Sequence, residues 1–388
     1  MFFENILPSF GRAGRRFMTE LRRDPINKRW VIIASGRAKR PEHFKRDKKH
    51  SNAVVACPFC PGDEGKKTPP EIATFPDRRP RNSSDWQVRV IPNKYNAVGI
   101  DEKIKIQPFG MYLTITGYGA HEVIIESPNH DVLFEDQPLA HLMLILSAYK
   151  ERLLDLYKDP NIKQIVLYKN HGPEGGASIS HPHSQLITFP IVPQDFKDDL
   201  KGAKEYFEKE RSCLWCSILK WEMFTNYSVN DEDGKLIRND PAGIRLVYKN
   251  SAFTAYCPFA SRYPYEIHII PRKHSHSFGD IGIQEIRELA EILKVTIKKI
   301  NVVLKEIYSD SAPFNFVLHT SPNLNFQGNG DKFETIKKDF HWHIELYPVL
   351  SIQAGVEKGS GLYINVVSPE AAAKELREAQ IEEKKEEK

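Results

Sequence analysis

The chain has 388 residues, of which 40% are hydrophobic and 27% charged, and its formal net charge at pH 7 is +4. This length suits one large or two ordinary domains, and so small a charge argues against a polyanionic partner. No apolar run approaches the roughly 20 residues of a membrane span, and residues 1–16 lack the apolar segment of a secretory signal. We therefore expect a cytoplasmic globular protein that binds neither nucleic acid nor membranes.

A strand is predicted over residues 29–34, which are rich in β-branched side chains, and a basic turn follows at residues 37–41. Arg37 and Arg40 make this turn either a solvated loop or a clamp for phosphate, since the paired donors of arginine match phosphate oxygens. Composition alone favours the solvated loop.

Two C-x-x-C pairs, Cys57 with Cys60 and Cys213 with Cys216, account for four of the five cysteines. In a cytoplasmic chain such pairs indicate metal sites or redox motifs rather than structural disulfides. No thioredoxin-like context surrounds the second pair. Each pair therefore predicts a tight turn in which two thiolates hold one metal ion.

The segment H-x-H-x-Q at residues 181–185 follows a predicted strand over residues 164–168 and a loop rich in small residues. Every second side chain of a strand lies on the same face, so His181, His183 and Gln185 present two imidazoles and an amide together. The segment is either a surface histidine cluster or a site where a neutral imidazole binds a metal or acts as a nucleophile.

The same order of motifs occurs twice. Each copy has a C-x-x-C pair, a strand and turn that begin at Glu and reach His at the ninth position, an amphipathic helix, a strand and an H-x-H-x-(Gln/Glu) motif. The helices are predicted over residues 139–157 and 283–304. Five ordered matches predict an internal repeat, with an N-terminal repeat over 19–195, a C-terminal repeat over 196–373, and extensions at 1–18 and 374–388.

Each repeat offers a set of metal ligands. The ligands expected in the first repeat are Cys57, Cys60, His130 and either His181 or His183. Four filled positions leave none open to water, so the expected zinc ion is structural and the other histidine is free to react. In the second repeat the expected ligands are Cys213, Cys216, His274 and either His319 or His341, of which we favour His319.

The two H-x-H motifs differ in the residue that ends them. Glu345 follows His343 where Gln185 follows His183. A carboxylate repels phosphate, so we expect the second motif to be structural. The first motif suits nucleophilic attack by an imidazole on phosphorus, or general acid–base hydrolysis of a nucleotide.

The H-P-H-S-Q motif, the first C-x-x-C pair, the S-P-N-H segment at residues 127–130 and the basic turn together resemble the galactose-1-phosphate uridylyltransferase family, a branch of the histidine-triad superfamily. The resemblance spans residues 21–373. It implies an α+β fold of two histidine-triad-like repeats, each an antiparallel half-barrel sheet with packed helices. It also implies nucleotide-sugar and sugar-phosphate substrates and a homodimer.

The same resemblance implies a reaction, in which UMP passes from UDP-glucose to His183 and then to galactose 1-phosphate. Gln185 would contact the transferred phosphoryl group, and His181 would complete the first zinc site. The residues implied to line the nucleotide and phosphate site are Arg37, Arg40, Asn93, Asn170 and Ser178.

Some residues depart from the family pattern. Lys94 stands where the well-known bacterial transferases have an acidic residue, and Cys213 and Cys216 suggest a second zinc site. In these features and in residues 359–365 the chain also resembles the related ADP-glucose phosphorylases. We favour uridylyl transfer and keep the phosphorylase as the alternative, ahead of a nucleotide hydrolase or a non-catalytic zinc scaffold. The base and the acceptor, a hexose phosphate or inorganic phosphate, stay open.

Overall fold

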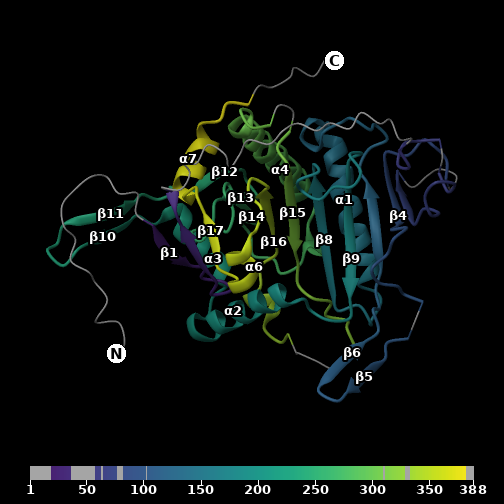
Figure 1. Cartoon of the computed structure of the whole chain (residues 1–388), viewed down its shortest axis with the longest axis horizontal. Helices are drawn as coiled ribbons and strands as arrows, with labels where there is room; N and C mark the ends of the chain where they lie inside the picture. Colours follow the sequence, from purple (N-terminus) through teal and green to yellow (C-terminus); the bar gives the residue numbers. More distant parts are fainter. Residues whose placement is uncertain are drawn as a thin grey trace.

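The computed structural model describes residues 19–35, 57–62, 64–76, 82–101, 103–308, 311–327 and 333–381. The basic turn with Arg37 and Arg40 lies outside these ranges. Within them, the main feature is a ten-stranded sheet in the order β12-β13-β14-β16-β15-β8-β9-β7-β4-β3 (Figure 1). Neighbouring strands in this sheet are antiparallel.

The ten strands divide into two halves of five. The N-terminal half contains β3 (Ala73–Phe75), β4 (Val88–Pro92), β7 (His121–Ile125), β8 (Gln164–His171) and β9 (His183–Phe189). The C-terminal half contains β12 (Leu246–Lys249), β13 (Phe253–Tyr256), β14 (Ile267–Pro271), β15 (Phe314–His319) and β16 (His343–Pro348). In each half, the first three strands along the chain run inward from the outer edge and are followed by the fifth and then the fourth. The two halves meet where β8 pairs with β15.

Helices α1 (Leu139–Leu156) and α4 (Ile283–Leu304) cover one face of the sheet. Their apolar stripes, which include Leu142 and Leu289, pack against alternate strand residues such as Ile124 and Leu346. Both helices match their predicted bounds to within one residue. The α+β fold of antiparallel strands with packed helices is confirmed.

The opposite face carries the cysteine pairs. In the N-terminal half, Phe59 and Trp86 pack on Ile91, Val123 and Ile125. In the C-terminal half, helices α2 (Gln194–Glu210), α3 (Leu214–Phe224) and α5 (Ile336–Asp339) lie over the sheet. This face therefore holds both H-x-H motifs.

Shorter elements surround this framework. They are the sheet of β1 (Glu20–Arg23), β2 (Trp30–Ile33) and β17 (Tyr363–Asn365), the hairpins β5 (Ile106–Phe109) with β6 (Tyr112–Ile115) and β10 (Tyr227–Asn230) with β11 (Leu236–Asp240), the 3-10 turns η3 (Phe134–Asp136) and η4 (Phe278–Asp280), and helices α6 (Gly355–Ser360) and α7 (Pro369–Glu378). Among the described residues, no helix combines the length and hydropathy that a membrane crossing requires.

Both ends of the described chain pack on the C-terminal half. Arg22 in β1 donates hydrogen bonds to Glu370 at the start of α7 and to the carbonyl of Phe259. Helix α7 buries Leu376 completely in the core beneath α4. Strand β1, which the sequence division assigns to the N-terminal repeat, thus contacts the C-terminal half. The predicted boundary at residue 373 falls inside α7, whose apolar face is buried. The division itself stays a prediction.

Because α7 packs in the core through Leu376, truncation of this side chain should destabilise the protein. Leu376→Ala removes a fully buried side chain and should lower the free energy of unfolding by about 2–5 kcal/mol. Lys374→Ala, an exposed change on the same helix, should stay within about 0.5 kcal/mol of the parent protein. Urea unfolding of the two variants measures both values, and an equal effect of the two changes would contradict the packing of α7.

Candidate active site and metal centres

The first cysteine pair lies beside two histidines. Cys57, Cys60, His130 and His181 each offer one ligand atom, and these atoms lie within 4.8 Å of one another. Sγ of Cys60 is 3.5 Å from Nδ1 of His130 and 3.7 Å from Nδ1 of His181. Two thiolates and two imidazole nitrogens form the donor set of a closed tetrahedral metal site.

Hydrogen bonds orient both imidazoles toward the sulfur atoms. Nε2 of His181 donates to the carbonyl of Ser127 at 2.7 Å, and Nε2 of His130 lies 3.0 Å from the hydroxyl of Ser180. A carbonyl oxygen only accepts, so the His181 proton sits on Nε2 and its Nδ1 keeps the lone pair for a metal. The Ser180 hydroxyl can accept the corresponding bond from Nε2 of His130. Burial lowers the pKa of His181 to about 4, which keeps its imidazole neutral at neutral pH. The residues fit a metal ion.

His183 lies at the start of β9, two residues beyond His181, with its side chain largely buried. Its Nδ1 donates to the carbonyl of His181 at 2.8 Å, so Nε2 carries the lone pair. This Nε2 has no hydrogen-bond partner among the described residues. The ring of Phe59, from the first cysteine turn, meets the His183 ring edge-on with the centroids 5.4 Å apart. The cysteine turn thus supports His183 directly.

The protonation state of His183 suits a nucleophile. Burial lowers its pKa, and the hydrogen bond to the carbonyl of His181 opposes this effect only in part. The ammonium of Lys169, which also lies nearby, lowers the pKa further. His183 is therefore predominantly neutral at neutral pH, with an unshared pair on Nε2.

Gln185 is held by three donors. Its Oε1 accepts hydrogen bonds from Nδ2 of Asn93 at 3.2 Å, from Nε2 of His121 at 3.1 Å and from the hydroxyl of Tyr168 at 3.1 Å. The backbone N–H of Ala97 donates to Nδ1 of His121, which places the His121 proton on Nε2. Because the amide oxygen is fully used, the amide NH₂ of Gln185 is the end left to donate to a substrate.

A buried charge pair supports the backbone of His183. Nζ of Lys169 lies 2.5 Å from Oε2 of Glu126 and donates to the carbonyl of His183 at 3.1 Å. The hydroxyls of Tyr149 and Ser184 bond Glu126 on its other oxygen. Burial alone would raise the pKa of Glu126, but Lys169 and the two hydroxyls outweigh it and hold the pKa below its usual value.

The second cysteine pair repeats the first arrangement with one change from expectation. Cys213, Cys216, His274 and His341 form a group of ligand atoms within 4.8 Å of one another. Nδ1 of His341 lies 3.5 Å from Sγ of Cys216 and 4.0 Å from Sγ of Cys213. The structure thus places His341, and not the preferred His319, beside these cysteines, because H-x-H alternation puts His341 where His181 lies in the first half.

His319 lies in a separate buried cluster. It stacks on His343 with the ring centroids 4.8 Å apart, and its two nitrogens face Asp199 at 3.3 Å and Glu345 at 3.4 Å. Burial alone would lower the pKa of His319, but the two carboxylates raise it to about 10. Asp199, His319 and His343 also offer ligand atoms close to one another.

The C-terminal H-x-H motif has different surroundings from the N-terminal one. Nε2 of His343 is buried without a hydrogen-bond partner, 3.6 Å from Oε1 of Glu345. Arg262 pairs with Glu345 at 2.8 Å. A buried carboxylate beside the imidazole opposes an approaching phosphate, in line with the structural role expected of this motif.

Two further residues of the predicted substrate site lie on β8 and the loop after it. Asn170 faces β15, where its Oδ1 accepts a hydrogen bond from Nδ2 of Asn315 at 2.8 Å. Ser178 is exposed on the loop before β9 and has no hydrogen-bond partner within the described ranges. Asn93 joins Gln185 directly. The structure thus brings Asn93 and Gln185 together and leaves the substrate roles of Asn170 and Ser178 as predictions.

Sequence reasoning missed His121, Tyr168 and the pair of Glu126 and Lys169. His121 and Tyr168 lie in predicted strands, and only the register of β7 and β8 on β9 shows that both reach Gln185. Asp199 was missed because it belongs to a helix of mostly charged residues. Strand alternation is the signal that points to His121, because it places this residue on the same face of β7 as Val123 and Ile125.

Comparisons with known proteins give consistent results. The family described as "Galactose-1-phosphate uridyl transferase, N-terminal domain" matches residues 12–193. An ADP-glucose phosphorylase from Arabidopsis thaliana is 36% identical over 366 residues, which cover 93% of each chain. A galactose-1-phosphate uridylyltransferase from Thermotoga maritima is 28% identical and covers 94% of this chain and 100% of its own. The crystal structure of the Arabidopsis thaliana phosphorylase with bound ADP-glucose matches with a TM-score of 0.74 and 32% identity, over 94% of this chain and 100% of that one.

The two cysteine groups predict the metal content of the protein. We expect two metal ions per chain, and Cys60→Ser and Cys216→Ser should each remove one by breaking a donor set of four. Elemental analysis of the purified variants measures this content. His341→Ala should lose an ion and His319→Ala should keep both. Loss of an ion in His319→Ala but not in His341→Ala would contradict the grouping.

Proposed function

Because the chain belongs to the galactose-1-phosphate uridyl transferase family, we propose that it moves a nucleotidyl group from a nucleotide sugar to a phosphate acceptor through a covalent intermediate on His183. That it is a nucleotidyltransferase of this family follows from the comparisons. The proposal concerns the residues and the substrates.

One observation carries the assignment of His183. Its Nδ1–H is committed to the carbonyl of His181, while Nε2 has no partner in the described part of the chain. A neutral imidazole with a free, oriented lone pair is the form that attacks an electrophile. The free NH₂ of Gln185, two residues along the same face, provides a neutral donor for a phosphoryl oxygen.

In the first step one bond forms and one bond breaks. Nε2 of His183 attacks the α-phosphorus of the nucleotide sugar, and the bond from that phosphorus to the bridging oxygen breaks. The electron pair leaves with glucose 1-phosphate. In the second step, a phosphate oxygen of the acceptor attacks the same phosphorus, the phosphorus–nitrogen bond breaks and the electron pair returns to Nε2. One difficult transfer is thus divided into two easier ones.

The described residues have separate roles in this reaction. His121, Tyr168 and Asn93 hold Gln185 so that its NH₂ faces the transferred phosphoryl group. Lys169 and Glu126 fix the backbone at His183 from beneath. Phe59 packs on the His183 ring and limits its rotation. Arg37 and Arg40 stay predicted phosphate ligands.

We assign zinc to both cysteine groups. Two thiolates with two imidazoles favour this ion, and four protein ligands leave no position for water or substrate. The ion would supply stability: it would join the first cysteine turn to the beginning of β9 through His181. The homodimer and the cytoplasmic location expected from the sequence stay predictions.

Two substrate pairs are candidates, and each has its own support. The 36% identity to an ADP-glucose phosphorylase favours ADP-glucose with inorganic phosphate. The family match and the 28% identity to a uridylyltransferase favour UDP-glucose with galactose 1-phosphate. Lys94, next to Asn93, provides a cation where the bacterial transferases have an acidic residue, which suits an additional phosphate charge in either acceptor.

The covalent intermediate can be trapped. Incubation with a nucleotide sugar labelled in its α-phosphate, without acceptor, should label the protein through a phosphoramidate that is labile in acid and stable in base. His183→Gly should abolish the label and the turnover, since no other imidazole occupies its position. Its metal content should not change, because His183 is not one of the four ligands. A folded, metal-loaded parent protein that takes no label would refute the proposal.

A donor and acceptor panel decides between the substrate pairs. The enzyme is assayed with UDP-glucose and galactose 1-phosphate, and separately with ADP-glucose and inorganic phosphate, under equal conditions. We expect kcat/KM for one pair to exceed the other by at least about 100-fold, because a base edge that is left unpaired in a buried site costs several kcal/mol. Equal rates for both pairs would show that the site does not distinguish the bases.

A further inference from the structure

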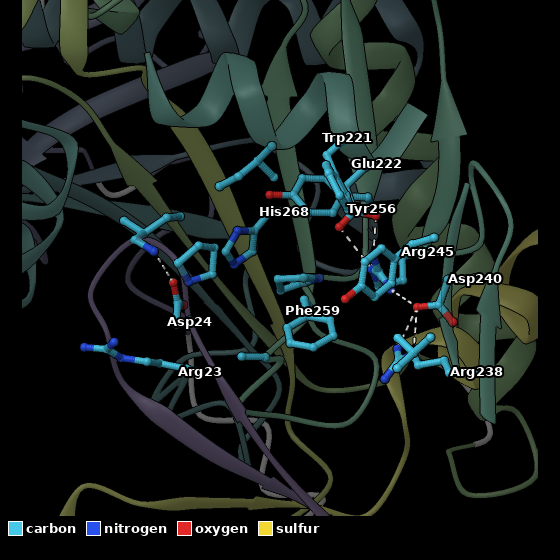
Figure 2. Close-up of a pocket in the computed structure, with 17 residues that line it drawn as sticks. Arg23, Asp24, Trp221, Glu222, Arg238, Asp240, Arg245, Tyr256, Phe259 and His268 are labelled. Atoms are coloured by element: carbon cyan, nitrogen blue, oxygen red, sulfur yellow. Dashed lines mark hydrogen bonds and ion pairs between the residues drawn. The ribbon is translucent and has the colours of Figure 1, made fainter. Parts of the chain in front are cut away.

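A cavity of about 450 Å³ lies in the C-terminal half, between the end of β1, helix α3, strand β13 and the β10–β11 hairpin (Figure 2). This volume falls in the range of roughly 300–1,000 Å³ typical of small-molecule sites. Most of its lining is apolar or aromatic, and includes Ile26, Ile218, Trp221, Tyr227 and Val229. Neither the metal groups nor the catalytic residues described above belong to it.

Polar atoms without partners face this cavity. The hydroxyl of Tyr256 has no hydrogen-bond partner in the described ranges, although the side chain is only 2% exposed. His268 also borders the cavity, and its Nδ1 is buried without a hydrogen-bond partner in the described part of the chain. Oδ1 of Asp24 accepts from the N–H of Ile26, which leaves Oδ2 available. Unpaired polar atoms in such a place are unfavourable until a ligand or water satisfies them.

These polar atoms lie close together. Tyr256 and His268 are directly opposite each other on β13 and β14, and their ring centroids are 5.9 Å apart. Burial raises the pKa of Asp24 to about 6 despite the N–H bond it accepts, and His268 is one of the charges that act on it. The wall thus combines a hydroxyl, an imidazole nitrogen and a carboxyl oxygen.

The two halves of the sheet can be compared position by position at this cavity. His268 lies opposite Glu345, as Val123 lies opposite Gln185 in the other half. Tyr256 therefore corresponds to Ile91. The N-terminal pair is apolar and packs under Phe59, while the C-terminal pair is polar and borders a cavity. The cavity thus occupies the same face of the sheet as the catalytic site.

The charged side chains that line the cavity do not favour the binding of a phosphate group. Arg245 is paired with Glu222 and Asp240, and Arg238 with Asp240. Arg23 borders the cavity but its side chain extends away from it (Figure 2). The carboxyl of Asp24 remains as a group that would repel an anion. A ligand that uses the interior should therefore carry no phosphate.

We propose that this cavity binds an uncharged nucleobase or nucleoside at a non-catalytic site of the C-terminal repeat. The planar ring packs against Trp221 and Tyr227 near the opening, where both side chains are about half exposed. Its polar edge bonds Tyr256, His268 and Asp24. A flat ring with donors and acceptors on its rim fits an apolar cavity with one polar wall. The proposal does not depend on the reaction at His183.

Binding of adenosine and of uridine to the full chain tests this proposal. Calorimetric titration is done in excess ADP and UDP together, so that a catalytic site for either nucleotide is filled, while their charge should keep both out of the cavity. We expect one of the two nucleosides to bind at one per chain. AMP, which differs from adenosine by the phosphate alone, should not displace it.

Substitutions locate the binding. Tyr256→Phe removes only the unpaired hydroxyl and should weaken binding about fivefold, the usual worth of one hydrogen bond. Trp221→Ala should weaken it at least about fivefold through lost stacking. Phe224→Ala, an exposed change on the same helix and outside the cavity, is the matched control and should bind as the parent does.

Two results would overturn the proposal. One is that neither nucleoside binds in the presence of ADP and UDP. The other is binding that both Tyr256→Phe and Trp221→Ala leave unchanged. Nucleotidyl transfer should be unaffected in all three variants, so a failure of the transfer reaction and a failure of this site give different results.

Discussion

The candidate site depends on one hydrogen bond, from Nδ1 of His183 to the carbonyl of His181. The ring of His181 is grouped with Cys57, Cys60 and His130, and the next carbonyl, that of Pro182, accepts from the N–H of Glu126, so both contacts hold the backbone that accepts this bond. The same bond decides the tautomer of His183 and frees Nε2. The cysteine turn, the strand and Nε2 of His183 are therefore linked, and in the proposed reaction the metal-ligand group orients the imidazole that attacks.

The second half has the same framework with different residues around the imidazole. His343 still donates Nδ1 to the carbonyl of His341, and His341 still lies beside two cysteines. Glu345 replaces the neutral amide, and Arg262, His268 and His319 gather around its charge. Both H-x-H motifs thus share one geometry, and they differ in whether an amide or a carboxylate lies beside the second imidazole.

Much of the fold was predictable from the sequence, because the two copies repeat their motifs in one order. The long helices α1 and α4 and the strands next to them follow from periodicity. The site was predictable where motif residues carry it, as for His183 and Gln185. The contacts of His121 and Tyr168 with Gln185 depend on strand register, which no local pattern encodes. The position of His341 beside the second cysteine pair, with His319 opposite His343 on the neighbouring strand, also depends on strand register.

The pairing of β8 with β15 leaves neither half with an exposed inner strand. Each half alone would end in a long strand with unpaired N–H and C=O groups, which invites association with other chains. In the fused protein those two edges satisfy each other, and Asn315 bonds Asn170 across the join. Removal of the C-terminal half would expose β8, the innermost strand of the half that contains His183. The C-terminal half thus covers the inner edge of the N-terminal half.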